Sequence, residues 1–275
     1  MAELFQVNSF WTGRPLGELE LMCLLSMQKQ GHKVRIFSYG PIGPLPEGVE
    51  LADANDIIPR RRFLFHASTG SPALGTDVFR FRLMQQQAGL WLDSDMLLLA
   101  PIAVTSGPVF GWQNRSLINC AVLHLPADSK SLSDLLAFTA EPYPIPPFYR
   151  PKKQALLRFR KAIGLPRHVT TMGWGVFGPR ALTWFAQQSG EAEQARAQEV
   201  FYPVGSRTAH GPLMAGWDTE SYLTDETIGL HLWNEALRKR SDLRPKNPKG
   251  TLLIEPESFV ARYARRELGL TLKGD

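Results

Sequence analysis

The stretch LWLDSDMLLL, residues 90–99, places two aspartates between two short apolar runs. Short apolar runs are typical of buried strands, and carboxylates two residues apart leave an extended chain on the same side. Two unpaired charges beside a sheet core would be costly, and a divalent cation would remove that cost. Because Mg²⁺ and Mn²⁺ prefer carboxylate oxygens, Asp93 and Asp95 are candidate metal ligands. The alternative is a turn in which one aspartate caps the chain, since short acidic pairs are common on surfaces.

Strand-like and helical segments alternate on both sides of this stretch. Strand periodicity is found at residues 4–7, 34–39, 109–113, 118–125, 201–204, 227–232 and 252–254. Helical periodicity is found between Pro15 and Gly31, at 77–87 with Thr76 as candidate N-cap, and at 132–138, 152–162, 180–188 and 258–268. The β-α-β order predicts an α/β fold whose sheet carries crossover helices. There are no internal repeats and no clear boundary, so we expect a single domain.

Composition fits a globular protein with a basic surface. The 275 residues are 44% hydrophobic and 21% charged, with a net charge of +5, and Lys and Arg concentrate at 60–62, 150–161 and 238–249. Such a surface suits anionic ligands or an anionic membrane face. No basic motif interleaved with aromatic residues and no zinc motif accompanies it, so nucleic acid is not expected as a partner.

The sequence predicts a cytoplasmic protein, with peripheral contact to the inner membrane compatible with its charge. Cys23 and Cys120 have the surroundings of small buried hydrophobic residues, and low cysteine use favours a reducing compartment. The amino-terminal residues lack the pattern of a signal peptide, and no apolar window is long enough to cross a bilayer. Residues 141–151 contain five prolines and are expected to form a linker or a mobile loop before the basic helix.

A second pair of charged residues precedes the acidic stretch. Asp77 and Arg80 lie three apart on one helix face, and Arg80 precedes Asp93 by thirteen residues. The order Asp-x-x-Arg, helix, Gly-containing turn, apolar strand and Asp-x-Asp resembles the glycosyltransferases that carry a DXD motif. These are the family 32-like mannosyl- and galactosyltransferases of capsular polysaccharide type and, more distantly, the glucosylating domains of clostridial toxins. An exposed salt bridge within the helix is the alternative for Asp77 and Arg80.

The resemblance covers most of residues 5–236 and is densest at 5–40 and 74–101. It implies a GT-A fold, a Rossmann-like mixed sheet flanked by helices, with a nucleotide-sugar-binding half at about 1–101 and an acceptor-side half at about 102–275. In place of the Gly-Gly-x-Tyr that the family often shows, this chain has Ala88-Gly89-Leu90-Trp91, which leaves the donor sugar open.

The resemblance also implies roles for individual residues. Asp93, Asp95 and His231 would bind Mn²⁺ or Mg²⁺. The residues implied in binding the nucleotide-sugar are Trp11, Asp77, Arg80, Asp93 and Asn119, and those implied in catalysis are Asp77, Arg80 and Asp95. His210 is a weaker alternative third ligand, and a buried structural role is the alternative for His231. Phe10 is expected in the core, Gly178 in a turn that shapes the pocket floor, and His32 and His124 in structural roles.

The function implied is transfer of a hexose from a UDP- or GDP-sugar to a glycan, glycolipid or other hydroxyl acceptor, with retention, in polysaccharide biosynthesis. One alternative is a phosphohydrolase with Asp93 as nucleophile. Such enzymes normally have Thr or Val after the acidic pair and carry it near the chain start, whereas Met96 follows here, a third of the way in. The other is a non-enzymatic binder of nucleic acid or a membrane surface through the basic segments.

Overall fold

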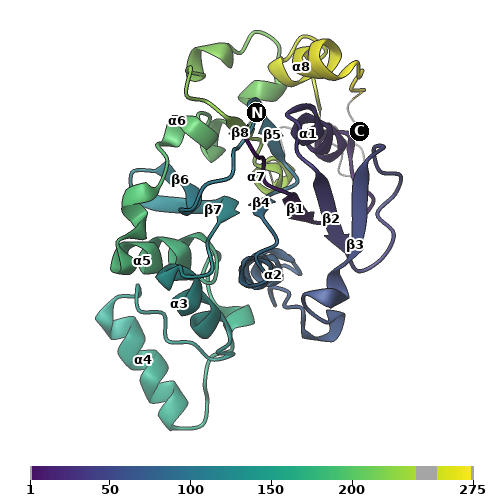
Figure 1. The fold of residues 1–275 in the computed structure, drawn as a ribbon. Coiled ribbons are helices and arrows are strands. Elements are labelled where there is room, and N and C mark those ends of the chain that lie inside the picture. Colours follow the sequence, from purple (N-terminus) through teal and green to yellow (C-terminus); the bar gives the residue numbers. More distant parts are fainter. Residues whose placement is uncertain (1, 240–252, 274–275) are drawn as a thin grey trace. The chain divides into compact units, whose positions relative to one another are not determined.

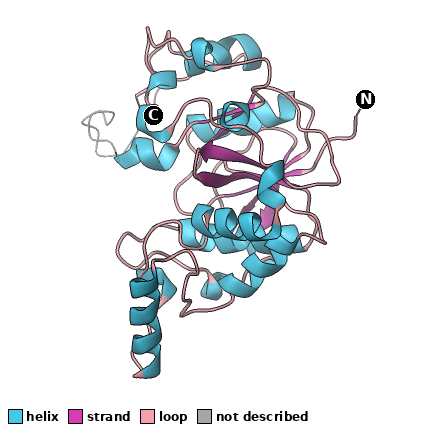
Figure 2. Ribbon diagram, turned by 90° about the vertical axis from the view of Figure 1, so that its left-hand side faces the viewer, coloured by secondary structure: helices cyan, strands magenta, loops and turns pink. Residues whose placement is uncertain are grey.

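The structure is a computed structural model that describes residues 2–239 and 253–273. The chain is a mixed α/β protein with a six-stranded mixed sheet flanked by helices, so the predicted fold class is confirmed (Figures 1 and 2). The strands are β1 Val7–Phe10, β2 Val34–Ser38, β3 Val49–Asp53, β4 Leu90–Leu92, β5 Met96–Leu98, β6 Val109–Asn114, β7 Leu117–His124 and β8 Gly229–His231. The α-helices are α1 Glu18–Lys29, α2 Ala73–Gln85, α3 Lys130–Thr139, α4 Pro151–Ala162, α5 Pro179–Ser189, α6 Gln198–Phe201, α7 Asn234–Lys239 and α8 Phe259–Leu268.

Two compact units make up the fold. The first unit comprises Met1–Ala52, Leu92–Val104 and Ala197–Asp275, and the second comprises Asp53–Trp91 and Thr105–Arg196. The strand order is β3-β2-β1 in the first unit and β4-β7-β6 in the second. No helix in the described part of the chain is long and apolar enough to cross a membrane.

The first unit begins with a β-α-β crossover. β1 pairs in parallel with β2, in a register that sets Val7 opposite Val34, and α1 makes the connection. Parallel neighbours need such a crossover because a short turn cannot join them. α1 buries Leu19, Met22, Cys23 and Met27, and it ends before Gly31, whose φ of 88° is the left-handed conformation that glycine adopts readily.

A separate antiparallel pair, β5 and β8, completes the strands of the first unit. Met96 lies opposite His231, and Leu98 lies opposite Gly229. The backbone N–H of Leu98 donates to Oγ of Ser26 at 2.9 Å, which ties β5 to the buried face of α1. This pairing brings the residues before β5 beside the end of β8.

His32 links two parts of the first unit that are distant in sequence. Its Nδ1 lies 2.9 Å from the carbonyl oxygen of Phe5, and its Nε2 accepts a hydrogen bond of 3.1 Å from the backbone N–H of Ile102. Since Nε2 is an acceptor, the ring is neutral with its proton on Nδ1. Burial lowers the pKa of His32, although the bond to Phe5 works in the opposite direction.

In the second unit the β6–β7 hairpin packs against α5. β6 and β7 are antiparallel, and Oγ1 of Thr183 accepts a hydrogen bond of 2.9 Å from the backbone N–H of Ile118. α5 also contacts α3, and α3 contacts α2. One apolar cluster of this unit is formed by Leu74, Tyr149, Leu157, Val169, Met172, Val176 and Phe177.

Four local predictions differ from the structure, and one of them is the strand expected at 4–7, which is found at Val7–Phe10 instead. α2 begins at Ala73, and its N-cap is Pro72 rather than Thr76, whose hydroxyl instead donates to the carbonyl of Pro72. The strand predicted at 201–204 is wrong, because Phe201 ends α6 and the following residues are irregular. The strand predicted at 252–254 is absent at 253 and 254, and residue 252 lies outside the described residues. β3 was not predicted, because most of its side chains are exposed and its sequence has no apolar pattern.

Candidate functional site

Two aspartates and a histidine of the first unit converge beside the β5–β8 pair. Asp93 and Asp95 follow the end of β4, and His231 is the last residue of β8. One ligand atom from each of the three side chains lies within 4.8 Å of the others. Among the described residues, no other three His, Cys, Asp or Glu side chains gather so closely. The carboxylates thus share their site with an imidazole that the sheet register supplies.

Asp95 is buried, and each of its two carboxylate oxygens has a partner in the first unit. Its Oδ1 lies 3.2 Å from Nε2 of His231, and its Oδ2 accepts the backbone N–H of Asn234 at 2.8 Å. Burial raises the pKa of Asp95, but the charge of His231 and the hydrogen bonds from His231 and Asn234 together lower it below its usual value. Asp95 is therefore ionised at neutral pH, the state in which a carboxylate binds a cation.

Trp233 turns the chain so that Asn234 faces Asp95. Its φ of 55° is a left-handed conformation that bulky residues rarely adopt. The indole N–H donates to the carbonyl of Val204 at 2.8 Å, and the ring lies 4.2 Å from the His231 ring. Strain of this kind persists only where surrounding contacts hold it, and here it positions the first residue of α7.

Glu20 of α1 supports the cluster, and it was not predicted as a site residue. It is 1% exposed, and its Oε1 accepts hydrogen bonds from Asn234 Nδ2 at 2.9 Å, Arg14 Nη2 at 2.8 Å and Arg238 Nη2 at 2.7 Å. Burial raises the pKa of Glu20, while the charge of Arg14 opposes that rise. The one sequence pattern that points to Glu20 is its place three residues after Gly17, whose backbone N–H it caps at 2.9 Å.

The donor set around Asp95 fits a hard or borderline divalent cation. Two carboxylates and one imidazole are ligands that Mn²⁺ and Mg²⁺ accept, and 4.8 Å is only slightly longer than the span of about 4.2 Å across an octahedral Mg²⁺ site. The Oδ1 atom of Asn234 is also buried and accepts no hydrogen bond within the described part of the chain. Such an oxygen is costly to leave unpaired, and a bound ligand would satisfy it.

Trp11 lies in the first unit, directly after β1. Its backbone N–H donates to the carbonyl of Phe37, and its indole N–H donates to the carbonyl of Arg14 at 2.6 Å. The Arg14 guanidinium stands 5.0 Å from the Trp11 ring centroid, a cation–π arrangement. Phe10 is buried, in agreement with the core role expected for it.

Asp77 and Arg80 form a buried pair in the second unit. The Nη2 of Arg80 is 3.6 Å from Oδ1 of Asp77, and its Nη1 donates to the carbonyl of Cys120 at 2.5 Å. The guanidinium lies 4.8 Å from the centroid of the Trp91 ring. The pair is thus the intrahelical ion pair that the alternative expects, but it is buried and not exposed.

Asn119 and Gly178 complete the predicted residues of the second unit. Asn119 stabilises the β6–β7 hairpin, donating to Gln113 Oε1 at 2.6 Å and accepting from the backbone N–H of Ala121 at 2.8 Å. Gly178 lies so close to Asp77 that a Cβ at this position would overlap the carboxylate. The turn at Gly178 therefore shapes the surroundings of Asp77 and contributes no reactive group.

His210, the weaker candidate for a third ligand, lies elsewhere in the first unit. Its ring packs 5.8 Å from the ring of Trp217, and it does not belong to the Asp93–Asp95–His231 group. The structure therefore favours His231 of the two histidines.

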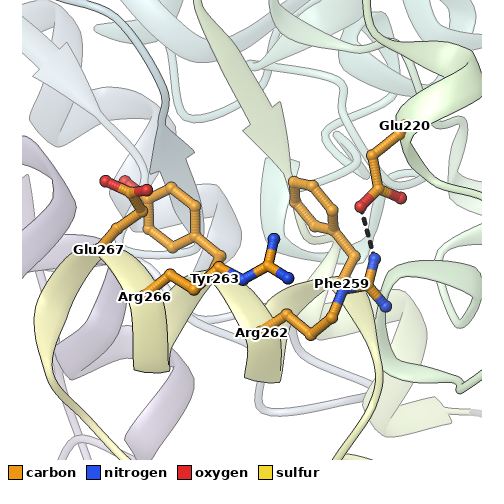
Figure 3. A pocket seen from close by; sticks show the side chains of 6 residues that line it. All are labelled: Glu220, Phe259, Arg262, Tyr263, Arg266 and Glu267. Carbon is orange, nitrogen blue, oxygen red and sulfur yellow. Dashed lines mark hydrogen bonds and ion pairs between the residues drawn. The ribbon is translucent and has the colours of Figure 1, made fainter.

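A small pocket of about 180 Å³ lies on α8, and its charges are largely balanced by one another. Figure 3 shows its lining, with Arg262 paired to Glu220 across the opening. Tyr263 donates to the carbonyl of Leu98, and burial raises its pKa to about 12. With two carboxylates facing two guanidiniums, this pocket offers no net charge to attract an ionic ligand.

Comparison with known proteins finds likeness to solved structures alone. No protein-family model matches the chain, and no curated protein matches it. Among solved structures, PaToxG Glycosyltransferase is similar with a TM-score of 0.42 and 10% identity, over 70% of this chain and 71% of that one. Values this low carry no information about the reaction.

Proposed function

We propose that this protein is a metal-dependent glycosyltransferase. It moves a hexose from a UDP- or GDP-sugar to a hydroxyl of a glycan or glycolipid, with retention at the anomeric carbon. The observation that supports this best is the convergence of Asp93, Asp95 and His231, whose ligand atoms lie within 4.8 Å of one another. Polysaccharide biosynthesis in the cytoplasm is the setting that we infer for this activity.

Asp93, Asp95 and His231 would hold Mn²⁺ or Mg²⁺, with the buried Oδ1 of Asn234 as a further oxygen donor. A bound cation would neutralise charge on the diphosphate that leaves with the nucleotide. Asn234 keeps Asp95 oriented through its backbone N–H, and Glu20 keeps Asn234 oriented through its side chain. Asp95 is thus oriented before any donor binds, as preorganised electrostatic stabilisation requires.

Charged residues next to this cluster favour an anionic donor. Arg14 and Arg238 both bind Glu20, which in turn contacts Asn234 beside Asp95. Once a divalent cation balances Asp93 and Asp95, two guanidiniums for the one carboxylate of Glu20 would leave an excess positive charge, which would attract a diphosphate. Trp11, stacked on Arg14, would lie against the base, because an aromatic face stacks on any base.

The residues of the second unit would act on the sugar. We assign Asp77 and Arg80 to hydrogen bonds with the sugar hydroxyls, which would hold the hexose in a reactive orientation. Asn119 would lie near the donor or the acceptor. No side chain is assigned as a nucleophile, because retention by attack on the face from which the nucleotide departs needs none.

A thermal-shift screen with UDP- and GDP-sugars in the presence of Mn²⁺ tests this proposal. A ligand that binds only the folded state raises the melting temperature, so one donor should stabilise the protein selectively and only with metal present. Asp95→Asn should lose that shift and metal-dependent donor hydrolysis. Asp128→Asn is the control, since Asp128 is an exposed aspartate of the second unit. Equal donor hydrolysis by wild type and Asp95→Asn would refute the metal role.

A further inference from the structure

Helix α4 of the second unit is exposed on nearly all sides. Only Leu157 is buried, where it joins the apolar cluster with Tyr149 and Val169. Figures 1 and 2 show α4 standing away from its neighbours α3 and α5. A helix attached by so little buried surface is unusual, because most helical stability in proteins comes from packing of an apolar face.

The face of α4 opposite Leu157 is apolar. Leu156 is 57% exposed, Phe159 61% and Ile163, the C-cap residue, 52%. Positions i, i+3 and i+7 share one side of a helix, so these side chains form a continuous apolar stripe. A stripe of large apolar side chains turned to solvent marks a surface that binds something.

Positive charge flanks this stripe on both sides. Residues 150–167 contain seven Lys or Arg and no Asp or Glu. At about 100° per residue, Lys152 lies within the stripe, Arg160 lies about 40° beyond Leu156 on one side, and Arg158 lies about 100° beyond Phe159 on the other. Lys161 pairs with Glu141, and Lys153 stands over the ring of Tyr149, but Lys152 and Arg160 have no partner among the described residues. The segment is therefore amphipathic and strongly cationic.

We propose that α4 docks this protein onto a membrane surface rich in anionic phospholipid. An apolar face edged by Lys and Arg is the composition of helices that lie in the interface between headgroups and acyl chains. The stripe would enter the acyl boundary, and the flanking cations would bind lipid phosphates. This surface is distinct from the metal cluster, and it would bring the site to acceptors carried on lipid.

Charge argues against one other occupant of this face, and the apolar stripe argues against another. A second copy of α4 would bring seven positive charges against seven more, which repel. Nucleic acid would use the cations but would leave Leu156, Phe159 and Ile163 in water. An anionic bilayer satisfies both the charge and the apolar stripe.

Co-sedimentation with phosphatidylcholine vesicles, with and without phosphatidylglycerol, tests the charge component. The full chain should bind only the anionic vesicles, and binding should weaken as salt is raised. Arg158→Glu/Arg160→Glu should reduce the affinity by about 30-fold or more, since each cation near an anionic surface contributes about fivefold. Arg61→Glu/Arg62→Glu is the matched control, because it changes net charge equally at two exposed arginines of the same unit and should leave binding within about threefold.

A fluorescent label tests the apolar component. Cys23 and Cys120 are fully buried, so Phe159→Cys supplies an accessible thiol for an environment-sensitive fluorophore. Anionic vesicles should shift its emission to the blue, whereas a label at Leu51→Cys, another exposed position, should not respond. Leu156→Ser/Phe159→Ser should weaken vesicle binding by about tenfold or more, since each buried apolar side chain adds to the partition.

Three results would overturn the proposal. They are equal binding to neutral and anionic vesicles, unchanged binding by Arg158→Glu/Arg160→Glu, and self-association without vesicles that Leu156→Ser/Phe159→Ser abolishes. The last result would assign the face to a second copy of the chain. Vesicle binding is measured without donor or metal, so its outcome is separate from that of the glycosyltransferase proposal.

Discussion

The Nε2 atom of His231 lies 3.2 Å from Oδ1 of Asp95, although 136 residues separate the two in the chain. The antiparallel register of β5 and β8 sets this distance, because Met96, the neighbour of Asp95, lies opposite His231. Asn234 holds the other carboxylate oxygen through its backbone N–H. The pairing of β5 and β8 therefore places His231 beside Asp95 without the help of a bound ligand.

His231→Gln should weaken Mn²⁺ binding by about 100-fold. Loss of a residue that only supports a metal ligand weakens binding by up to about 100-fold, so loss of a ligand itself should weaken it at least as much. Isothermal titration calorimetry measures this affinity without donor or acceptor. His210→Gln serves as the control, because His210 packs on Trp217 away from the cluster and should bind Mn²⁺ like the wild type. A large loss in His210→Gln with none in His231→Gln would reverse the assignment of the third ligand.

Local patterns in the sequence predict part of this site. Asp93 and Asp95 lie together, and β4 and β5 are found where the apolar runs predict strands. The two aspartates are joined by a turn, with the backbone N–H of Met96 bonded to the carbonyl of Asp93 at 3.0 Å, and not by the extended chain that their spacing predicts. Glu20 could not be predicted, because its partners Asn234 and Arg238 lie 214 and 218 residues away and only the fold brings them together. The left-handed conformation of Trp233 could not be predicted either, because glycine and asparagine are the residues that usually adopt it.

Glu20→Ala should destabilise the protein by about 2–3 kcal/mol and weaken Mn²⁺ binding by about tenfold. The stability loss is at the low end for a buried ion pair because Arg14 and Arg238 are partly exposed, and water can solvate them once Glu20 is gone. Denaturant unfolding and calorimetry measure the two effects.

The control for Glu20→Ala is Glu50→Ala. Glu50 pairs with Arg35 at 2.9 Å, but its side chain is 55% exposed, so the loss should stay below about 1 kcal/mol. If Glu20→Ala lost stability yet bound Mn²⁺ normally, Glu20 would be structural and would not position Asn234 for the metal.

Gly178→Ala should destabilise the second unit by about 1–3 kcal/mol and reduce donor turnover, because its Cβ would push the Asp77 carboxylate away from Arg80. Gly173→Ala provides a control from the same glycine-rich segment, since a Cβ at Gly173 would meet no atom within 4 Å. Thermal unfolding and steady-state turnover of both variants check the prediction. Wild-type turnover in Gly178→Ala would show that the position of Asp77 does not matter to the reaction.

The free energy of unfolding should fall as pH drops from about 7.5 to about 5.5, and His32 should account for part of that fall. Burial lowers the pKa of His32 in the folded state, so the unfolded chain binds a proton first as pH falls and is stabilised relative to the fold. Protonation of His32 would also set the new proton on Nε2 against the N–H of Ile102, two donors 3.1 Å apart. His32→Gln has no group that titrates in this range, so the slope of stability against pH should be smaller than in the wild type. Urea unfolding across this range measures both slopes, and identical slopes would mean that His32 does not change its protonation on unfolding.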